Sequence, residues 1–238
     1  MSSIKFILIG DSGVGKTCLI NQYSKQEFTE EHITTVTAGG DKTFKDVNLG
    51  NKTVKLEIWD TAGQEQYKAV NKIFMNKAKI AAIVYDMTNQ ETFDNIKNWY
   101  NELKDKNDTV EMIGIIANKS DLYEEQVVSK EEGENYAKSI NGFFYETSAM
   151  DYESVSNAFE DLTKKYVEKK EEEERKKEEE KEKVKIKKMK DEEKRKKEEE
   201  EERKKNEGIK LKASDHTTTD NKRKDGSNSG GGGWCYIL

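Results

Sequence analysis

The stretch Gly10-Asp11-Ser12-Gly13-Val14-Gly15-Lys16-Thr17 has the form G-x-x-x-x-G-K-[ST]. It follows an apolar run at residues 4–9, which has the length of a buried strand, and it precedes a segment of helical length. Between a strand and a helix, such glycines let the backbone wrap around phosphate groups and direct N–H groups at them. We therefore interpret residues 10–17 as a phosphate-binding loop rather than a glycine-rich turn with a surface lysine.

Three side chains near the end of this loop have distinct expected roles. The Lys16 ammonium can neutralise β- and γ-phosphate oxygens, and the Thr17 hydroxyl can ligate Mg²⁺. The N-terminus of the following helix adds a dipole that favours anions. Cys18 lies in the first turn of that helix, where we expect it to pack and to direct one backbone N–H toward an α-phosphate.

Further runs of strand length recur along the chain, at residues 43–47, 54–59, 80–85, 112–117 and 143–147. Most are followed by a turn signal and then by a longer helical pattern, and this alternation predicts an α/β fold with a mostly parallel sheet of six strands. Leu49-Gly50-Asn51-Lys52 is a hairpin signal between the second and third runs. One edge strand is therefore predicted to be antiparallel.

Two loops have the pattern expected for recognition of a guanine base. Asn118-Lys119-Ser120-Asp121 has the form N-K-x-D, and the Asp121 carboxylate can accept hydrogen bonds from guanine N1–H and the 2-amino group. Adenine offers no such pair of donors. Glu146-Thr147-Ser148-Ala149 follows the last strand, where the Ala149 N–H would meet the guanine carbonyl. Either segment alone could be a plain polar loop, but the phosphate loop upstream favours base recognition.

The segment Trp59-Asp60-Thr61-Ala62-Gly63-Gln64 closes the third strand. Asp60 can hold Mg²⁺ through water, the Gly63 N–H can reach a γ-phosphate, and Gln64 can orient the attacking water. A glutamine on a surface loop usually has no such role, but its position directly after the γ-phosphate glycine makes Gln64 the candidate catalytic residue.

The motifs GDSGVGKT, WDTAGQE, NKSD and ETSA, in this order, resemble those of the Ras superfamily, and residues 1–165 are most similar to the Rab family. The resemblance implies a three-layer G domain with a six-stranded sheet and five helices, which binds GTP or GDP with Mg²⁺ and switches by GTP hydrolysis. It also implies that the Phe28 ring packs on the base. The nucleotide-binding residues implied are Ser12, Gly13, Val14, Gly15, Lys16, Thr17, Cys18, Phe28, Gly63, Asn118, Lys119, Asp121, Ser148, Ala149 and Met150.

The sequence departs from the family pattern in the first switch segment. The family has a threonine two residues before a glycine, whose hydroxyl meets Mg²⁺, and both Thr37 and Thr35 are candidates here. Thr37 keeps the T-x-G spacing with Gly39, so the expected metal set is Thr17, Thr37 and Asp60, with Thr35 as the alternative. Rab proteins also usually place a phenylalanine at the position of Lys42, beside Trp59 and Tyr67. The resemblance therefore does not imply that this chain binds the effectors that Rab proteins usually bind.

The density of charged residues marks a boundary in the rest of the chain. Between residues 164 and 205, 37 of 42 residues are charged, which places the end of the G domain near residue 165. Opposite charges recur four residues apart, and the chain contains no proline, so residues 166–205 are predicted to form one long solvated helix that continues the last helix of the domain. A disordered charged tail is the alternative. The few apolar residues are too irregular for a coiled coil.

Residues 206–234 read as a flexible linker because they include Thr217-Thr218-Thr219 and four consecutive glycines. The sequence ends Cys235-Tyr236-Ile237-Leu238, a C-a-a-X pattern that predicts geranylgeranylation of Cys235. One lipid chain normally needs a second signal, and the basic cluster Lys222-Arg223-Lys224 is a candidate. Most Rab proteins end with two cysteines, so a single one leaves other Ras-like branches open.

Two function classes follow. The first is a lipid-anchored GTPase switch in membrane traffic, on the cytosolic face of an intracellular membrane, with an exchange factor, a GTPase-activating protein, effectors and a prenyl-binding chaperone as partners. The second is a nucleotide-dependent tether or scaffold with little hydrolysis. The net charge of −6 disfavours a nucleic-acid partner.

Overall fold

The computed structural model describes residues 3–28, 42–60, 75–107 and 109–215, and it consists of two compact units, Met1–Glu173 and Glu174–Leu238. The expected residues Thr35, Thr37, Gly63, Gln64 and Cys235 lie outside the described ranges. Among the described residues, no helix combines the length and the apolar character needed to cross a bilayer.

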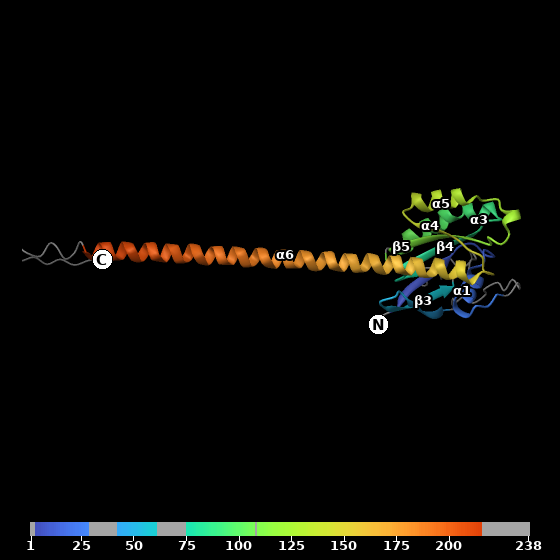
Figure 1. Ribbon diagram of the computed structural model, residues 1–238. Coiled ribbons are helices and arrows are strands. Elements are labelled where there is room, and N and C mark those ends of the chain that lie inside the picture. Colours follow the sequence, from blue (N-terminus) through green and yellow to red (C-terminus); the bar gives the residue numbers. More distant parts are fainter. Residues whose placement is uncertain (1–2, 29–41, 61–74, 108, 216–238) are drawn as a thin grey trace, which may run out of the picture. The chain divides into compact units, whose positions relative to one another are not determined.

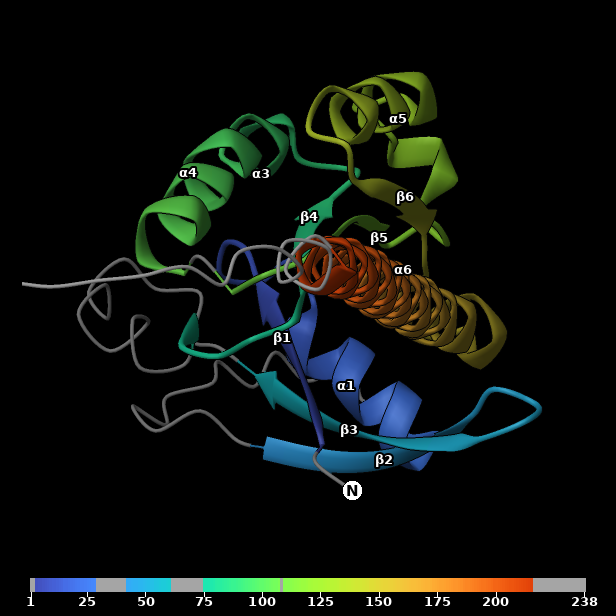
Figure 2. The same cartoon turned by 90° about the vertical axis from the view of Figure 1, so that its left-hand side faces the viewer.

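The first unit is built on one six-stranded sheet surrounded by helices (Figure 1), and its strand order is β2-β3-β1-β4-β5-β6 (Figure 2). All neighbouring strands are parallel except β2 and β3, which form the predicted antiparallel hairpin at the edge. The expected fold class is therefore confirmed. The strands are β1 (Ile4–Ile9), β2 (Lys42–Asn48), β3 (Thr53–Asp60), β4 (Ile80–Asp86), β5 (Met112–Asn118) and β6 (Phe143–Glu146).

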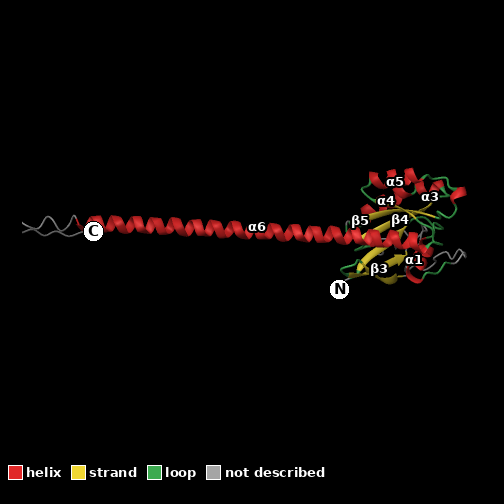
Figure 3. Ribbon diagram, viewed as in Figure 1, coloured by secondary structure: helices red, strands yellow, loops and turns green. Residues whose placement is uncertain are grey.

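Five α-helices and one 3-10 helix are present among the described residues, and Figure 3 distinguishes them from the strands by colour. A serine cap begins α5, where the Ser129 side chain and Glu132 form a reciprocal capping box. The helices are α1 (Lys16–Lys25), α3 (Gln90–Asp94), α4 (Ile96–Lys106), η2 (Tyr123–Glu125), α5 (Lys130–Ser139) and α6 (Tyr152–Asp215).

Side chains of β1 alternate between two hydrophobic clusters because successive residues of a strand point to opposite faces. Phe6 and Leu8 join the cluster that α1 and the start of α6 cover, where the Tyr23 and Phe159 rings stack with centroids 4.5 Å apart. Ile7 and Ile9 join the cluster on the other face, beneath α4 and α5 (Figure 2). The result is the three-layer arrangement expected for an α/β domain.

Ionic contacts follow Val167, the last residue of α6 in the hydrophobic core, still within the first unit. Lys170 pairs with Glu111, which lies just before β5, and also with Glu173 at 2.9 Å. Glu171 pairs with Lys52 of the β2–β3 hairpin. These contacts join the last residues of the first unit to two loops of the sheet.

The predicted long helix is present: α6 has 64 residues and is continuous from Tyr152 to Asp215. It continues past Lys205, so residues 206–215, which were expected to begin the linker, are helical. Extending an existing helix costs far less than nucleating one, which accounts for its passage into residues of mixed propensity.

Candidate functional site

Three loops from distant parts of the sequence meet at one edge of the sheet. Loop 10–15 follows β1, loop 118–121 follows β5, and loop 146–150 follows β6. These strands are parallel, so their carboxyl ends lie at the same edge, which is where open α/β sheets bind ligands. A hydrogen bond joins two of these loops directly, because the Ser120 N–H donates to the Thr147 carbonyl oxygen at 3.1 Å.

Loop 10–15 has a backbone that requires glycine. Gly10 has a φ of 145°, and a Cβ atom there would lie 2.2 Å from the Val84 carbonyl oxygen of β4. Gly15 has a φ of 95°, and its Cβ would lie 2.4 Å from the Asn118 amide nitrogen. Around Gly13 the space is open, with no described atom within 4 Å of the point that a Cβ would occupy. The loop is therefore packed closely against Val84 and Asn118, whereas no described atom lies close to Gly13.

Lys16 places a buried cation under this loop. Its side chain is only 5% exposed, and its Nζ donates to the carbonyl oxygens of Gly10 at 2.9 Å and Asp11 at 2.6 Å. Burial lowers the pKa of Lys16 to about 8, although the charges of Asp60 and Asp11 act in the opposite direction. None of the ion pairs among the described residues involves Lys16. An anion bound at the loop would stabilise the charged ammonium.

The lowered pKa predicts how the stability of the nucleotide-free protein depends on pH. Above pH 8 the folded protein loses the Lys16 proton, whereas the unfolded chain keeps it until about pH 10.4. The unfolded state then binds more protons, so the free energy of unfolding should rise with pH across this window, by roughly 1–3 kcal/mol. Urea denaturation between these pH values measures it. The Lys16→Met variant should lack the rise, and an equal rise in both proteins would contradict this assignment.

Two expected metal ligands lie side by side. The Thr17 hydroxyl donates to the Asp60 carboxylate with an Oγ1–Oδ2 distance of 2.6 Å. A hydroxyl and a carboxylate oxygen are hard ligands of the kind that Mg²⁺ prefers, and one ion could reach both. Among the described residues, no group of three or more carboxylate, histidine or cysteine side chains is placed so that it could hold a metal ion. A magnesium ion here would therefore depend on Thr17, Asp60 and oxygens from the ligand and water, together with the third expected residue, Thr37.

Loop 118–121 is bonded to both other loops. The Asn118 amide donates to the Val14 carbonyl oxygen at 2.8 Å, and its own carbonyl oxygen accepts from the Thr147 hydroxyl at 3.2 Å. Asn118 is 1% exposed, so these contacts are shielded from water. The residue therefore fixes the spacing between the loop expected to hold phosphate and the loops expected to hold the base.

Asp121 and Ser148 come from different loops and bond to each other, with the Ser148 hydroxyl donating to the Asp121 carboxylate. Ser148 also accepts from the Met150 N–H at 3.1 Å. Asp121 remains solvent-exposed, so its carboxylate is accessible to a ligand. The chemistry of this carboxylate suits the two adjacent N–H donors of guanine.

The remaining expected residues lie around this edge. Phe28, 37% exposed, follows α1 and presents a ring that a flat base could cover. Cys18 is half-buried against the core on the α1 side, and burial raises the pKa of its thiol. Ala149 is nearly buried, whereas Met150 is exposed.

Sequence reasoning did not identify Asp86, which ends β4 at the same edge. Its carboxylate pairs with the Lys119 ammonium at 2.6 Å, and Lys119 itself has a left-handed backbone with a φ of 67°. The pair holds the Lys119 side chain against β4. The position of Asp86 at the carboxyl end of a central strand was the available signal.

Asp11 was also not assigned a role. Its carboxylate accepts from the Asn95 amide at 2.8 Å and from the Trp99 indole N–H at 2.7 Å. Both donors belong to the α3–α4 segment, so this segment anchors the start of loop 10–15. No local pattern in the sequence indicates contacts across more than 80 residues.

On the sheet face beside this site, Lys42 and Trp59 are register neighbours on β2 and β3. The Lys42 ammonium lies 5.8 Å from the Trp59 ring centroid and 5.5 Å from that of Phe44, which is 49% exposed. Lys5 lies closer, at 4.1 Å from the Trp59 ring. The aromatic surface next to the candidate site is therefore flanked by positive charge. Tyr67, expected to contribute to it, lies outside the described ranges.

Comparison with known proteins places the chain in a family. The Ras family model matches residues 5–168. Ras-related protein Rab11B of Nicotiana tabacum is 42% identical over 163 residues, which are 68% of this chain and 74% of that protein. Ras-related protein Rab-21 of Homo sapiens is 39% identical over 166 residues, which are 70% of this chain and 73% of that protein. The chain therefore belongs to the Ras family and is a Rab-like small GTPase.

Proposed function

We propose that this chain binds GTP and GDP at the edge formed by loops 10–15, 118–121 and 146–150, and that it hydrolyses GTP as a molecular switch. The observation that carries the proposal is the buried Lys16 ammonium, which donates to two carbonyl oxygens of loop 10–15. Such a cation suits a polyphosphate, and the exposed Asp121 carboxylate at the same edge suits guanine.

In this mechanism the backbone N–H groups of residues 13–18 and the Lys16 ammonium bind the phosphates. Thr17, Asp60 and Thr37 would hold Mg²⁺, which neutralises charge on the phosphate oxygens. The Gly63 N–H binds the γ-phosphate and Gln64 orients a water molecule for attack on the γ-phosphorus, which yields GDP and inorganic phosphate. Phe28 stacks on the base, and Asn118, Lys119, Ser148, Ala149 and Met150 complete the pocket around it.

The switch would act in membrane traffic on the cytosolic face of an intracellular membrane. Geranylgeranylation of Cys235 would anchor it, and a prenyl-binding chaperone would carry it through the cytosol. The similarity of the chain to Rab proteins supports this role. The lysines around Trp59 favour effectors other than those that bind an all-apolar aromatic patch. We further propose that residues 1–165 switch and that residues 166–215, helical throughout, serve as a spacer before a linker and lipid anchor.

The length of α6 favours a second candidate function, a tether whose bound nucleotide is structural. Single-turnover GTP hydrolysis with Mg²⁺ by the full chain and by its Gln64→Leu variant discriminates between the two. For a switch, we expect slow turnover by the wild-type protein and a rate at least about tenfold lower in the variant, because the attacking water loses its orientation. Binding without turnover in either protein, even with candidate activating proteins, would support the tether.

A further inference from the structure

One segment of α6 differs in charge pattern from the rest of the helix. Residues 183–190, here called the basic band, contain five lysines and no acidic residue. Acidic residues border the band on both sides, with Glu182 before it and Asp191, Glu192 and Glu193 after it. At 1.5 Å per residue the band is about 12 Å long, slightly more than two helical turns.

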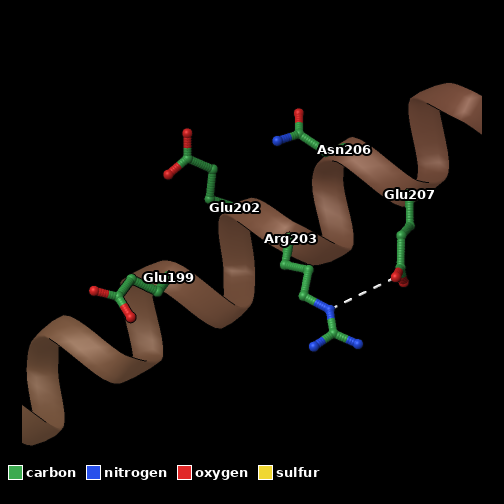
Figure 4. Close-up of a pocket in the computed structure, with 5 residues that line it drawn as sticks. All are labelled: Glu199, Glu202, Arg203, Asn206 and Glu207. Atoms are coloured by element: carbon green, nitrogen blue, oxygen red, sulfur yellow. Dashed lines mark ion pairs between the residues drawn. The ribbon is translucent and has the colours of Figure 1, made fainter.

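The lysines of the basic band differ in their contacts from the four basic residues at 194–197, all of which form ion pairs within the helix. On its C-terminal side, ion pairs four residues apart join Lys196 to Glu192 at 2.9 Å and Lys197 to Glu193 at 2.7 Å. Figure 4 shows a similar pair farther along, where Arg203 lies 3.6 Å from Glu207 beside a shallow hollow with exposed carboxylates. Among the ion pairs of the described residues, none includes a lysine of the basic band. Its positive charge is therefore uncompensated by these pairs.

The basic band also exposes apolar side chains. Val184 is 49% exposed, Ile186 is 46% exposed and Met189 is 63% exposed. Ile186 and Met189, three residues apart, share one face of the helix. Val184 lies about 200° around the helix from Ile186, because each residue turns the helix by about 100°. The apolar groups therefore lie on two opposed sides of the helix, and lysines precede and follow each of them in the sequence.

The position of the apolar side chains on two sides of the helix distinguishes three classes of binding partner: a bilayer, a second copy of the chain, and a protein with a groove. A flat anionic surface, such as a bilayer, would contact one apolar side at most and would repel the acidic residues at both ends of the band. A second copy of the chain could offer its run of five glutamates at 198–202, but Glu198, Glu199 and Glu200 already pair within their own helix. A groove that closes around about two turns could contact both apolar sides and leave the flanks in water.

We propose that the basic band is a docking site for an acidic protein that encloses a short helical segment in an apolar groove. Charge complementarity supplies the attraction, and burial of Val184, Ile186 and Met189 supplies the apolar contact. The site belongs to the second unit, whereas the loops of the sheet edge belong to the first. The proposal does not rest on GTP binding or hydrolysis.

Calmodulin is a suitable probe because its calcium-loaded form presents an acidic, methionine-rich groove that closes around helices. The full chain is titrated with calmodulin by calorimetry at about 0.15 M salt, with calcium and then with a chelator. We expect saturable binding that requires calcium. Two variants, Lys185→Glu/Lys187→Glu and Val184→Gln/Ile186→Gln/Met189→Gln, should each weaken it by about tenfold or more.

The matched control is Lys194→Glu/Lys196→Glu, which makes the same change of charge in the same helix but outside the basic band. It should change the affinity by less than about twofold, and circular dichroism checks that all variants keep their helix. Absence of calmodulin binding would overturn the proposal, and so would an equal loss in the control. Variant-sensitive binding to phosphatidylserine vesicles would assign the band to a membrane surface instead, and self-association lost in both variants would assign it to a second copy.

Discussion

Replacement of Asp121 by asparagine is expected to weaken GDP binding by roughly 10²- to 10³-fold and to allow binding of xanthosine diphosphate. In the proposed complex the carboxylate accepts from two adjacent N–H groups of guanine, and loss of such a charged acceptor costs about 2–5 kcal/mol. Xanthine has a carbonyl where guanine has its amino group, so an asparagine amide can donate to it. Fluorescent-nucleotide competition measures both affinities.

The Asp121→Asn variant should leave the fold unchanged because Asp121 is exposed and its hydrogen bond from Ser148 can be retained by an amide oxygen. Thermal unfolding of the nucleotide-free protein is the control. If the variant kept its preference for guanine, the base-recognition role of loop 118–121 would be wrong.

The Gly10→Ala substitution is expected to lower the free energy of unfolding by about 3–5 kcal/mol or to prevent folding. The added Cβ would lie 2.2 Å from the Val84 carbonyl oxygen, and that oxygen belongs to a buried strand that cannot shift without disturbing the parallel pairing of β1 and β4. The φ of 145° adds backbone strain of its own. Urea denaturation of the full chain provides the measurement.

Gly50→Ala is the matched control for Gly10→Ala. Gly50 also has a positive φ, 88°, but it lies in the β2–β3 hairpin with no described atom within 4 Å of an added Cβ. Backbone strain alone should cost about 1–2 kcal/mol there. Equal losses for the two variants would show that close packing against β4 does not contribute at Gly10.

The fold and the main loops could be predicted from the sequence because their signals are local. Loop 10–15 and loop 118–121 each follow a strand whose apolar run is visible, and their polar residues have a fixed spacing. The β2–β3 hairpin was predictable for the same reason, since Gly50 and its neighbours form a recognisable turn signal.

The contacts that support the site could not be predicted in the same way. The bonds from Asn95 and Trp99 to Asp11 span 84 and 88 residues, and the pair of Asp86 and Lys119 joins two strand ends. Such contacts depend on how helices pack on the sheet, which side-chain patterns along the sequence do not specify. The length of α6 beyond Lys205 likewise results from cooperative extension of an existing helix rather than from the local composition.

We propose that this edge of the sheet binds one guanine nucleotide together with Mg²⁺. The most direct test is to purify the full chain in Mg²⁺, denature it, and identify the released nucleotide by chromatography, with a parallel measurement of nucleotide release after chelation of the metal. We expect about one GDP or GTP per chain, because the described residues form one set of nucleotide loops, and much faster release once Mg²⁺ is removed. Release of an adenine nucleotide would contradict the proposed guanine site. So would failure of the chain to bind GDP after incubation with excess GDP.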